Sequence, residues 1–254
     1  MLTTDAGGRL HAIVAATDGL PPGLPELGSV FAPLPAVSRS SAVTVNAGLM
    51  TLAGPTSSGG QGNGAVLASA LAAGIAAAHL GGADGSALLA AFASGAEIGL
   101  RLALAVDTSR PRSGWASQQL VAGVAAAVTT AALLGGDADE IHAAIALGAT
   151  QASGLDGATN AVDTAFVTGE LASHGFESGV LALSGWAGPA LPLDGNRGFF
   201  QLLTGAQAPT AVTEDVGDVW LLLGLEDAAT EWRGRRFDPL DGMTSAEVAL
   251  LLGR

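Results

Sequence analysis

The segment 131–154, AALLGGDADEIHAAIALGATQASG, constrains the fold of this chain more than any other stretch. An apolar helix is expected to end at the glycine pair 135–136, because glycine readily adopts the left-handed conformation found after helix C-termini. Asp137 follows as a predicted N-cap, and Glu140 stands three residues later, at capping-box spacing. A second Ala-rich helix comes next. Two helices joined by so short a turn pack antiparallel, so the segment predicts a helical hairpin.

The same plan of helix, Gly-Gly, acidic residue and helix occurs earlier, in HLGGADGSALLAAFASGAEIG at 79–99. Repeated helical hairpins bury each other's apolar faces, so we expect a mainly α fold of antiparallel hairpins. The expected helices cover residues 65–80, 88–106, 118–134 and 162–183, the last of them with breaks at Gly169, Gly175 and Gly179.

The two ends of the chain have a different composition from its middle. Residues 1–44 contain five prolines and are predicted to form an irregular N-terminal arm. Residues 45–200 form the predicted helical domain, and residues 201–254 a short C-terminal extension packed on it. Within this extension we expect a short strand at 219–223 and a final helix that begins at the capping box 244–247.

Composition excludes several kinds of chemistry. The chain contains no cysteine, tyrosine or lysine, which excludes thiolate metal sites, phenolic acids, Schiff bases and a P-loop lysine. The net charge of −13 argues against binding to nucleic acid or to an anionic membrane. The start of the chain has no signal-peptide pattern, and residues 66–80 read as a buried helix rather than a membrane span. We therefore expect a soluble, cytoplasmic protein.

Several short motifs occur in the order and spacing of a known family over residues 45 to 200. They are VNAG (45–48), EIGLRL (97–102), GW (114–115), AALLG (131–135), ATQASGL (149–155), GWAGP (185–189) and DGNRGFF (194–200). In these motifs the chain resembles the MmgE/PrpD family, whose members include 2-methylcitrate dehydratase, cis-aconitate decarboxylase and an iminodisuccinate epimerase. The resemblance implies an all-helical domain and, commonly, a homodimer. Full-length members add an α+β lid, for which the residues after Phe200 are too few, so we expect the lid to be absent.

The resemblance also shows which positions would carry the family's chemistry, and each one holds a small or neutral residue here. The family's Asp-Asp-Thr loop falls on Thr56, Ser57 and Ser58. The His of its His-Pro-Gly loop falls on Gly62 or Gln61, and the His of its Gly-Trp-His-Pro segment falls on Ala116. Its lysine falls near Thr164. Dehydration by the family's route needs a matched base and acid and a cation for the carboxylate. That route is therefore not available to this chain.

Three residues remain as candidates for catalysis. His174 could act as a general base with Glu170, four residues earlier on the same helical face, or the two could form a surface pair. Asp163, near a helix start, could act as a base or simply cap the helix. Gln118 begins a helix whose N–H groups favour an anion or a polarised carbonyl group.

Five further residues are candidates for binding a substrate. Arg112 and Trp115 lie in a loop that borders the substrate in the family. The guanidinium group of Arg112 could hold a carboxylate there. The alternative is that this loop is an ordinary solvent-exposed loop. Gln119 shares the helix start with Gln118, and Gln61 and Asn63 lie on the glycine-rich loop before another helix, although such loops are also ordinary turns. The four histidines have no metal-ligand spacing, so we expect neither a metal nor a cofactor. Glu97 and Arg101 are interpreted as a structural pair.

These observations leave three functional hypotheses. The first is a divergent lyase, isomerase or cyclase that acts without a cofactor on a small carboxylate or carbonyl-containing metabolite, in specialised metabolism. Such reactions can be accelerated by positioning and carbonyl polarisation. The second is a non-catalytic homologue that binds a ligand, and the third is a partner subunit. A ligand-binding protein should have convergent polar groups, whereas a partner subunit should have an exposed apolar face.

Overall fold

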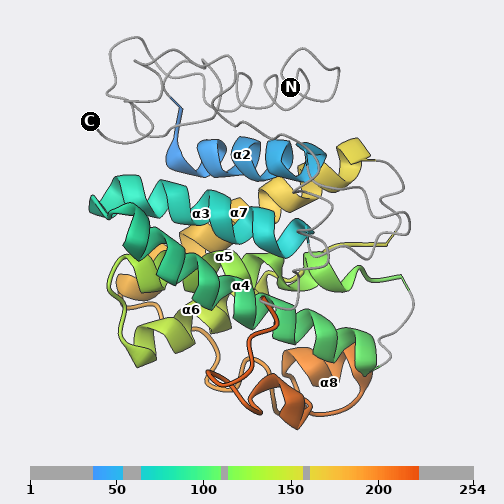
Figure 1. Ribbon diagram of the computed structural model, residues 1–254. Coiled ribbons are helices and arrows are strands. Elements are labelled where there is room, and N and C mark those ends of the chain that lie inside the picture. The colour runs from blue at the N-terminus through green and yellow to red at the C-terminus, as the bar shows by residue number, and fades with distance from the viewer. Residues whose placement is uncertain (1–36, 54–63, 110–113, 157–160, 223–254) are drawn as a thin grey trace. The chain divides into compact units, whose positions relative to one another are not determined.

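The computed structural model describes residues 37–53, 64–109, 114–156 and 161–222. These residues contain no strand and only one isolated β-bridge, so the predicted mainly α class is confirmed. Their seven α-helices are α2 (Arg39–Ala53), α3 (Gly64–Gly81), α4 (Gly85–Thr108), α5 (Ser117–Leu133), α6 (Ala138–Thr150), α7 (Ala161–Leu183) and α8 (Phe199–Thr204), followed by the 3-10 turn η1 (Thr210–Val212) (Figure 1).

The hairpin predicted from the segment 131–154 is formed by α5 and α6. Gly135 follows the end of α5 with a left-handed φ of 86°. The Asp137 side chain accepts hydrogen bonds from the N–H groups of Asp139 and Glu140, and the Glu140 carboxylate accepts one from the Asp137 N–H at 2.9 Å. This reciprocal pair is the predicted capping box, and it satisfies donors that the helix itself leaves unpaired.

The earlier copy of the same plan forms a second hairpin, α3–α4. Asp84 is the N-cap of α4, and its carboxylate accepts a hydrogen bond from the Ala87 N–H at 2.8 Å. The repeat seen in the sequence is therefore a structural repeat.

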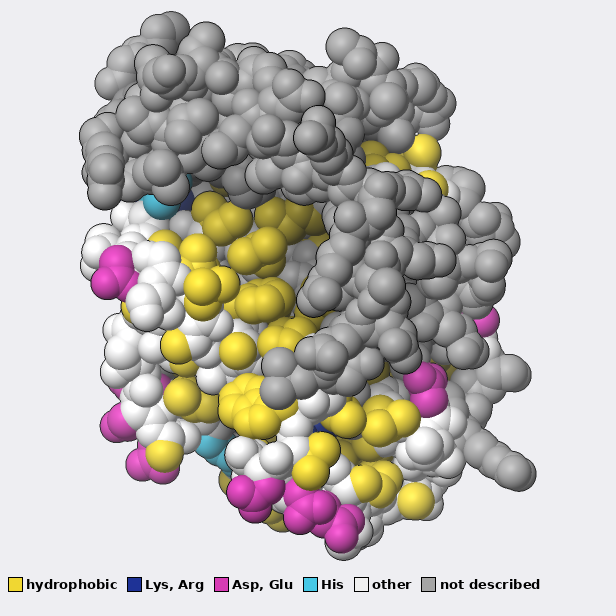
Figure 2. Space-filling model, in the orientation of Figure 1, with side chains coloured by type: hydrophobic (Ala, Val, Ile, Leu, Met, Phe, Trp, Pro, Cys, Tyr) yellow, Lys and Arg dark blue, Asp and Glu magenta, His cyan; other side chains and the backbone are white. Residues whose placement is uncertain are grey.

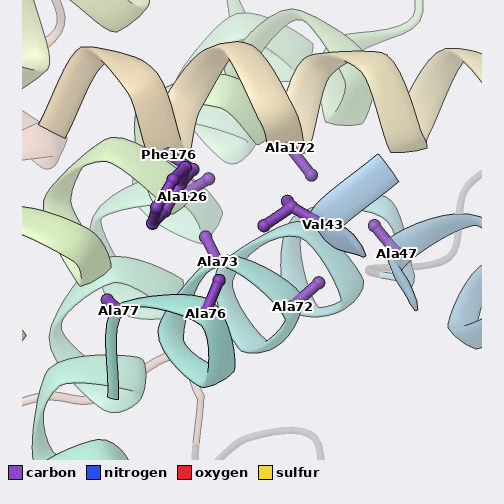
Figure 3. Close-up of a cluster of buried hydrophobic side chains, with 9 residues drawn as sticks. All are labelled: Val43, Ala47, Ala72, Ala73, Ala76, Ala77, Ala126, Ala172 and Phe176. Atoms are coloured by element: carbon purple, nitrogen blue, oxygen red, sulfur yellow. The ribbon is translucent and has the colours of Figure 1, made fainter. Parts of the chain in front are cut away.

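The core is built around α5, which packs against α3, α4, α6 and α7 (Figure 1). Residues 119–131 of α5 are all buried, and most of them are Ala, Val or Gly. Figure 3 shows how small side chains fill one part of this core, with Phe176 as the only aromatic residue. The cluster consists of Val43, Ala47, Ala72, Ala73, Ala76, Ala77, Ala126, Ala172 and Phe176. Such small residues let helix axes approach closely.

Glycine contacts fix the direction of α7 relative to α5. Gly175 lies against the Gly123 backbone, and Gly179 lies against the Thr130 side chain. Later residues of α7 therefore meet later residues of α5, and the two helices run parallel.

Helix α3 runs in the same direction. Its Gly74 lies against Thr129 and its Gly81 against Leu134, so α3 and α5 are also parallel. The first turns of α3, α5 and α7 consequently lie at one end of the bundle, at the right of Figure 1. We call it the loop end, because residues 114–116, which precede α5, and residues 151–156, which follow α6, lie there.

Three local expectations from the sequence are wrong. Helix α7 is continuous through Gly169, Gly175 and Gly179, because these glycines are sites of close helix packing. Helix α2 begins at Arg39, inside the expected N-terminal arm, because Ser38 accepts a hydrogen bond from the Ser41 N–H and starts the helix there. Residues 219–222 form a bend and turn rather than a strand. The expected helix that begins at residues 244–247 lies outside the described residues.

Two helices, α3 and α4, are long and apolar enough to span a membrane. Inside this protein, however, 56% and 61% of their most apolar windows are buried against other helices. This burial agrees with the prediction that residues 66–80 form a buried helix.

The chain divides into two units, Met1–Val219 and Trp220–Arg254. All the helices listed above belong to the first unit, which is called the helical unit below. Only residues 220–222 of the second unit are described.

Candidate functional site

The start of α5 has no side-chain cap. Its N-cap residue is Ala116, which has no side-chain hydrogen-bonding group. The backbone there is instead paired with the loop after α6: the Ala116 N–H donates to the Gly154 carbonyl at 3.1 Å, and the Asp156 N–H donates to the Gly114 carbonyl at 2.9 Å. These two bonds flank the bridge between Trp115 and Leu155. The connections that precede α5 and follow α6 are thus held together at the loop end.

Gln119 lies in the first turn of α5 beneath this paired backbone. Its side chain is only 4% exposed, yet its Oε1 atom has no hydrogen-bond partner in the structure. Gly154 packs directly on it: a methyl group added to Gly154 would lie 2.5 Å from Gln119 Cβ and 2.9 Å from Oε1. Gly154 also has a φ of +131°, which disfavours any residue with a Cβ. The glycine thus holds the carboxamide in place.

The other candidates at the loop end are more accessible. Gln118 is half-buried in the first turn of α5, and Trp115 is 37% exposed just before it. Asp163 is exposed in the first turn of α7, which begins at Ala161, so the carboxylate lies inside the helix and not at its N-cap. The structure thus places Trp115, Gln118, Gln119 and Asp163 at the same end of the bundle.

His174 lies elsewhere. Its neighbour Gly175 packs on Gly123, which is five residues beyond Gln118 and hence about 7.5 Å further along the helix axis. The exposed His174 lines a shallow depression between α5, α6 and α7, together with Leu120, Gly123, Gly148, Gln151, Ala152, Leu171 and Gly175. Within the described part of the chain, no hydrogen bond or ion pair joins it to Glu170, although both lie on α7. The depression brings His174 to Leu120 in the first turn of α5, but His174 is eleven residues beyond Asp163 and so does not lie in the first turn of α7.

Gln61, Asn63 and Arg112 lie outside the described residues, as do the family-related positions 56–58 and 62. No cluster of His, Asp and Glu in the described ranges could hold a metal ion.

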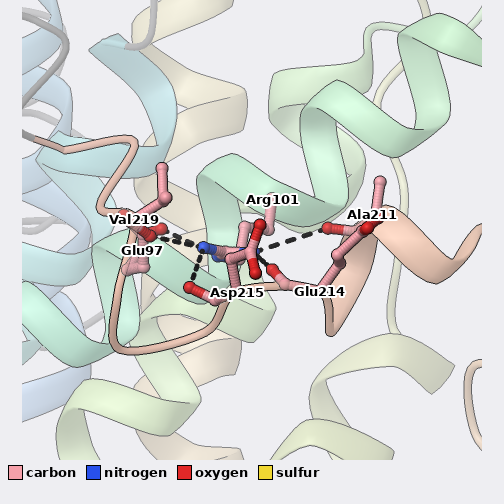
Figure 4. A network of polar contacts seen from close by, with 6 residues as sticks. All are labelled: Glu97, Arg101, Ala211, Glu214, Asp215 and Val219. Carbon is pink, nitrogen blue, oxygen red and sulfur yellow. Dashed lines mark hydrogen bonds and ion pairs between the residues drawn. The ribbon is translucent and has the colours of Figure 1, made fainter.

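A polar site that the sequence did not reveal lies around Arg101. Arg101 is 7% exposed and donates to the Glu97 carboxylate at 2.8 Å, which confirms the predicted structural pair. Its guanidinium group also donates to four backbone carbonyls of the segment after α8 (Figure 4). These belong to Ala211 (3.5 Å), Glu214 (2.6 Å), Asp215 (3.4 Å) and Val219 (2.5 Å). We call these contacts the Arg101 clamp.

The clamp fixes residues 211–219 on α4. The i,i+4 spacing of Glu97 and Arg101 is visible in the sequence. The carbonyl partners are not, because they are backbone groups more than a hundred positions away and do not depend on which side chains those residues carry.

A model of the MmgE/PrpD N-terminal domain matches residues 53–211. The chain belongs to the MmgE/PrpD family. No curated protein matches the sequence. The matched range contains every candidate site residue and all of α3 to α8.

Two positions at which the resemblance implied catalytic residues of the MmgE/PrpD family fall on described residues. Ala116 is the N-cap of α5, and Thr164 lies in the first turn of α7. Ala116 directly precedes the α5 turn that holds Gln118 and Gln119, and Thr164 follows Asp163 in the first turn of α7. The structure thus brings these positions to the same part of the bundle as the remaining polar candidates.

Proposed function

We propose that the loop end of this MmgE/PrpD domain binds a small carboxylate or carbonyl-containing metabolite and converts it, without a cofactor, in a lyase, isomerase or cyclase reaction. The observation that carries the proposal is the shared position of the first turns of α3, α5 and α7, where α5 has no side-chain cap. Helix N-termini attract negative charge, because their first N–H groups have no partner within the helix. The start of α5, whose N-cap residue makes no side-chain cap, therefore favours a carboxylate or a developing enolate oxygen.

Asp163 is the general base that this arrangement favours. It is exposed in the first turn of α7, at the same end as Gln118. A carboxylate there can remove a proton from the carbon next to a carbonyl group. The negative charge then moves to the carbonyl oxygen, where helix N–H groups and the Gln118 carboxamide stabilise it. His174 is the second candidate, because it lines a depression together with Leu120 in the first turn of α5.

Two matched variants test this proposal. The wild type is screened by thermal shift against small dicarboxylates, tricarboxylates and β-keto acids, and each compound that binds is followed by NMR for turnover. A ligand at a hundred times its Kd should stabilise the fold by about 2.7 kcal/mol. We expect Asp163→Asn to bind the same compound and to lose turnover by about a hundredfold or more. His174→Ala should retain both binding and turnover.

The outcomes separate the parts of the proposal. Turnover lost in His174→Ala and kept in Asp163→Asn would move the base to the depression between α5, α6 and α7. Binding with no turnover of any compound would leave a ligand-binding homologue in place of an enzyme. No binding at all would overturn the proposed site.

A second candidate function is that of a partner subunit, including association as a homodimer. Hydrophobic side chains gather over α3 and α4 on the face shown in Figure 2. The exposed large hydrophobic residues of these two helices include Leu80 of α3, which is 42% exposed, and Leu89 of α4, which is 66% exposed. Exposed apolar surface of this kind favours an interface with another protein or a second copy.

A pair of leucines with equal exposure tests this alternative. Leu89 on α4 and Leu191, in the segment between α7 and α8, are both 66% exposed. If α3 and α4 form an interface, Leu89→Ser should lower the molar mass measured by light scattering, whereas Leu191→Ser should not. A monomeric wild type with no co-purified protein would contradict the subunit role.

A further inference from the structure

We propose that the Asp194–Gly195 pair is a site of spontaneous isoaspartate formation, and that the side chain of Gln207 controls how fast this modification occurs. The inference is independent of the proposed function, because it concerns the turn before α8 and needs no ligand. It assigns to this turn a covalent change of the backbone and names the contact that holds the change back.

The first step of the argument is the chemistry of the pair. The backbone nitrogen of a residue after aspartate can attack the aspartate side chain, and glycine hinders this attack least because it has no Cβ. The Gly195 nitrogen bonds to Cγ of Asp194, and the proton of that nitrogen leaves with the carboxyl hydroxyl group as water. The product is a succinimide ring. Another water molecule then opens the ring at either carbonyl carbon and gives aspartate or isoaspartate.

The second step is the conformation and exposure of the pair. Gly195 has a φ of +86°, which disfavours any residue with a Cβ, so the turn keeps glycine at the position that makes Asp194 reactive. Asp194 is exposed and Gly195 is half-buried. Water can therefore leave and enter during the reaction without unfolding of the helices.

The third step is the restraint on both reacting groups. The Gly195 N–H donates to Gln207 Oε1 at 2.9 Å, and the Ala208 N–H donates to Asp194 Oδ1 at 2.9 Å. We call these two hydrogen bonds the Asp194 clasp. Attack requires the nitrogen and Cγ to be aligned at contact distance. Each bond of the clasp fixes one of the two groups, so the rotation that aligns them has to wait until the clasp opens locally.

The fourth step is the effect of the modification on the turn. Isoaspartate leads the main chain through its own side chain and lengthens it by one atom. The turn is tight, because the Gly198 N–H donates to the Gly195 carbonyl at 3.0 Å, and the Asp194 carbonyl oxygen lies where a Cβ on Gly198 would be. An additional main-chain atom therefore displaces Gly195, and the modified chain loses the Asp194 clasp.

Rates of isoaspartate formation in the full chain test the inference. Samples are incubated at mildly acidic pH. Isoaspartate is then quantified by enzymatic methylation and assigned to its position by electron-transfer fragmentation of peptides. In the folded wild type we expect Asp194 to convert about a hundredfold more slowly than in the chain unfolded in urea, which is about tenfold for each hydrogen bond of the clasp.

The variant Gln207→Met keeps the length of the side chain and removes the acceptor for the Gly195 N–H. We expect the rate at Asp194 to rise about tenfold in the folded variant, since one of the two bonds is lost. Gln207 is exposed, so this substitution leaves the core unchanged. The comparison of folded and unfolded wild type requires no variant and stands even if Gln207→Met does not fold.

The chain offers two controls. Asp84–Gly85 is the other Asp-Gly pair that lies wholly within the described ranges, and its carboxylate accepts a hydrogen bond from the Ala87 N–H at 2.8 Å. Its rate, measured in the same samples, should be equal in the wild type and in Gln207→Met. Gln151→Met, the same change at another exposed glutamine, should leave the rate at Asp194 unchanged.

The modified chain provides a further readout. Protein that carries isoaspartate at position 194 can be separated from the unmodified chain by ion-exchange chromatography. Its Gly195 and Ala208 amides should exchange faster with solvent, because the clasp no longer protects them.

Four outcomes would overturn parts of the inference. Equal rates at Asp194 in the folded and unfolded wild type would show that the turn does not restrain the reaction. A wild-type rate in folded Gln207→Met would remove the controlling role of Gln207. The absence of isoaspartate at Asp194 from samples in which Asp84 reacts would overturn the site itself. Unchanged amide exchange in the modified chain would show that the clasp survives the modification.

Discussion

Single atoms decide how closely the helices of this domain approach. At Gly95 in α4, an added methyl group would meet the Thr129 side chain and lie 2.5 Å from the Ala125 carbonyl oxygen of α5. At Gly85, in the first turn of the same helix, an added methyl group has nothing within 4 Å. Replacing glycine by alanine at these two positions therefore compares a crowded position with an open one in the same helix.

We expect Gly95→Ala to destabilise the protein by about 1–3 kcal/mol, because the new methyl group forces α4 away from α5. Gly85→Ala should stabilise it by up to about 1 kcal/mol, since alanine favours the helix and meets no neighbour. Urea unfolding followed by circular dichroism measures both. Equal effects of the two substitutions would show that the close contact between α4 and α5 is not maintained in solution.

At the residue scale, the sequence predicts contacts between residues that are close together in the chain. It does not predict contacts between residues that are far apart in it. The capping box of Asp137 and Glu140 was predictable because its two partners lie three residues apart. The contact between Gln119 and Gly154 was not, because it depends on a positive φ and on a loop that returns to the start of α5. The family motif around Gly154 marked the position without revealing its physical role.

At the element scale, helix positions were predicted well and helix continuity was not. The ends of α5 agree with the prediction to within one residue, because caps and glycines are local signals. The glycines of α7 were misread as breaks. In isolation glycine weakens a helix, but at Gly175 it lets α7 approach the Gly123 backbone, and packing then outweighs propensity.

The Arg101 clamp gives a prediction at this scale, since it joins α4 to the segment 211–219. Arg101→Met would leave the Glu97 carboxylate buried without its guanidinium partner, and would remove the guanidinium donors from the carbonyls of the segment. We expect a loss of about 3–5 kcal/mol, the usual effect of removing one member of a buried ion pair. Amide hydrogen exchange in residues 211–219 should become faster as well.

Replacing both members of the pair provides the control. Glu97→Leu combined with Arg101→Met removes the buried charge and should recover part of the lost stability. Exchange in residues 211–219 should stay fast in the double variant, because the guanidinium donors of Arg101 are still missing. Unchanged exchange in Arg101→Met would show that other contacts hold this segment.

At the scale of the helical unit, the candidate site follows from the alternation of the hairpins. Helices joined by short turns alternate in direction, so α3, α5 and α7 all begin at one end. This rule explains why Gln118, Gln119 and Asp163, each predicted near a helix start, come to the same end. His174 was chosen as the histidine that the family resemblance places closest to the substrate crevice, and it lies in the middle of α7 rather than near a helix start.

The Arg101 clamp also bears on how this chain is made. Arg101 precedes its partner Glu214 by 113 positions, and ribosomes add about 5–20 residues per second. The arginine on α4 therefore leaves the ribosome roughly 6 to 23 seconds before the carbonyls that will surround it. During that interval the Glu97–Arg101 pair must remain hydrated, so α4 cannot reach its final burial until the segment up to Val219 has been synthesised.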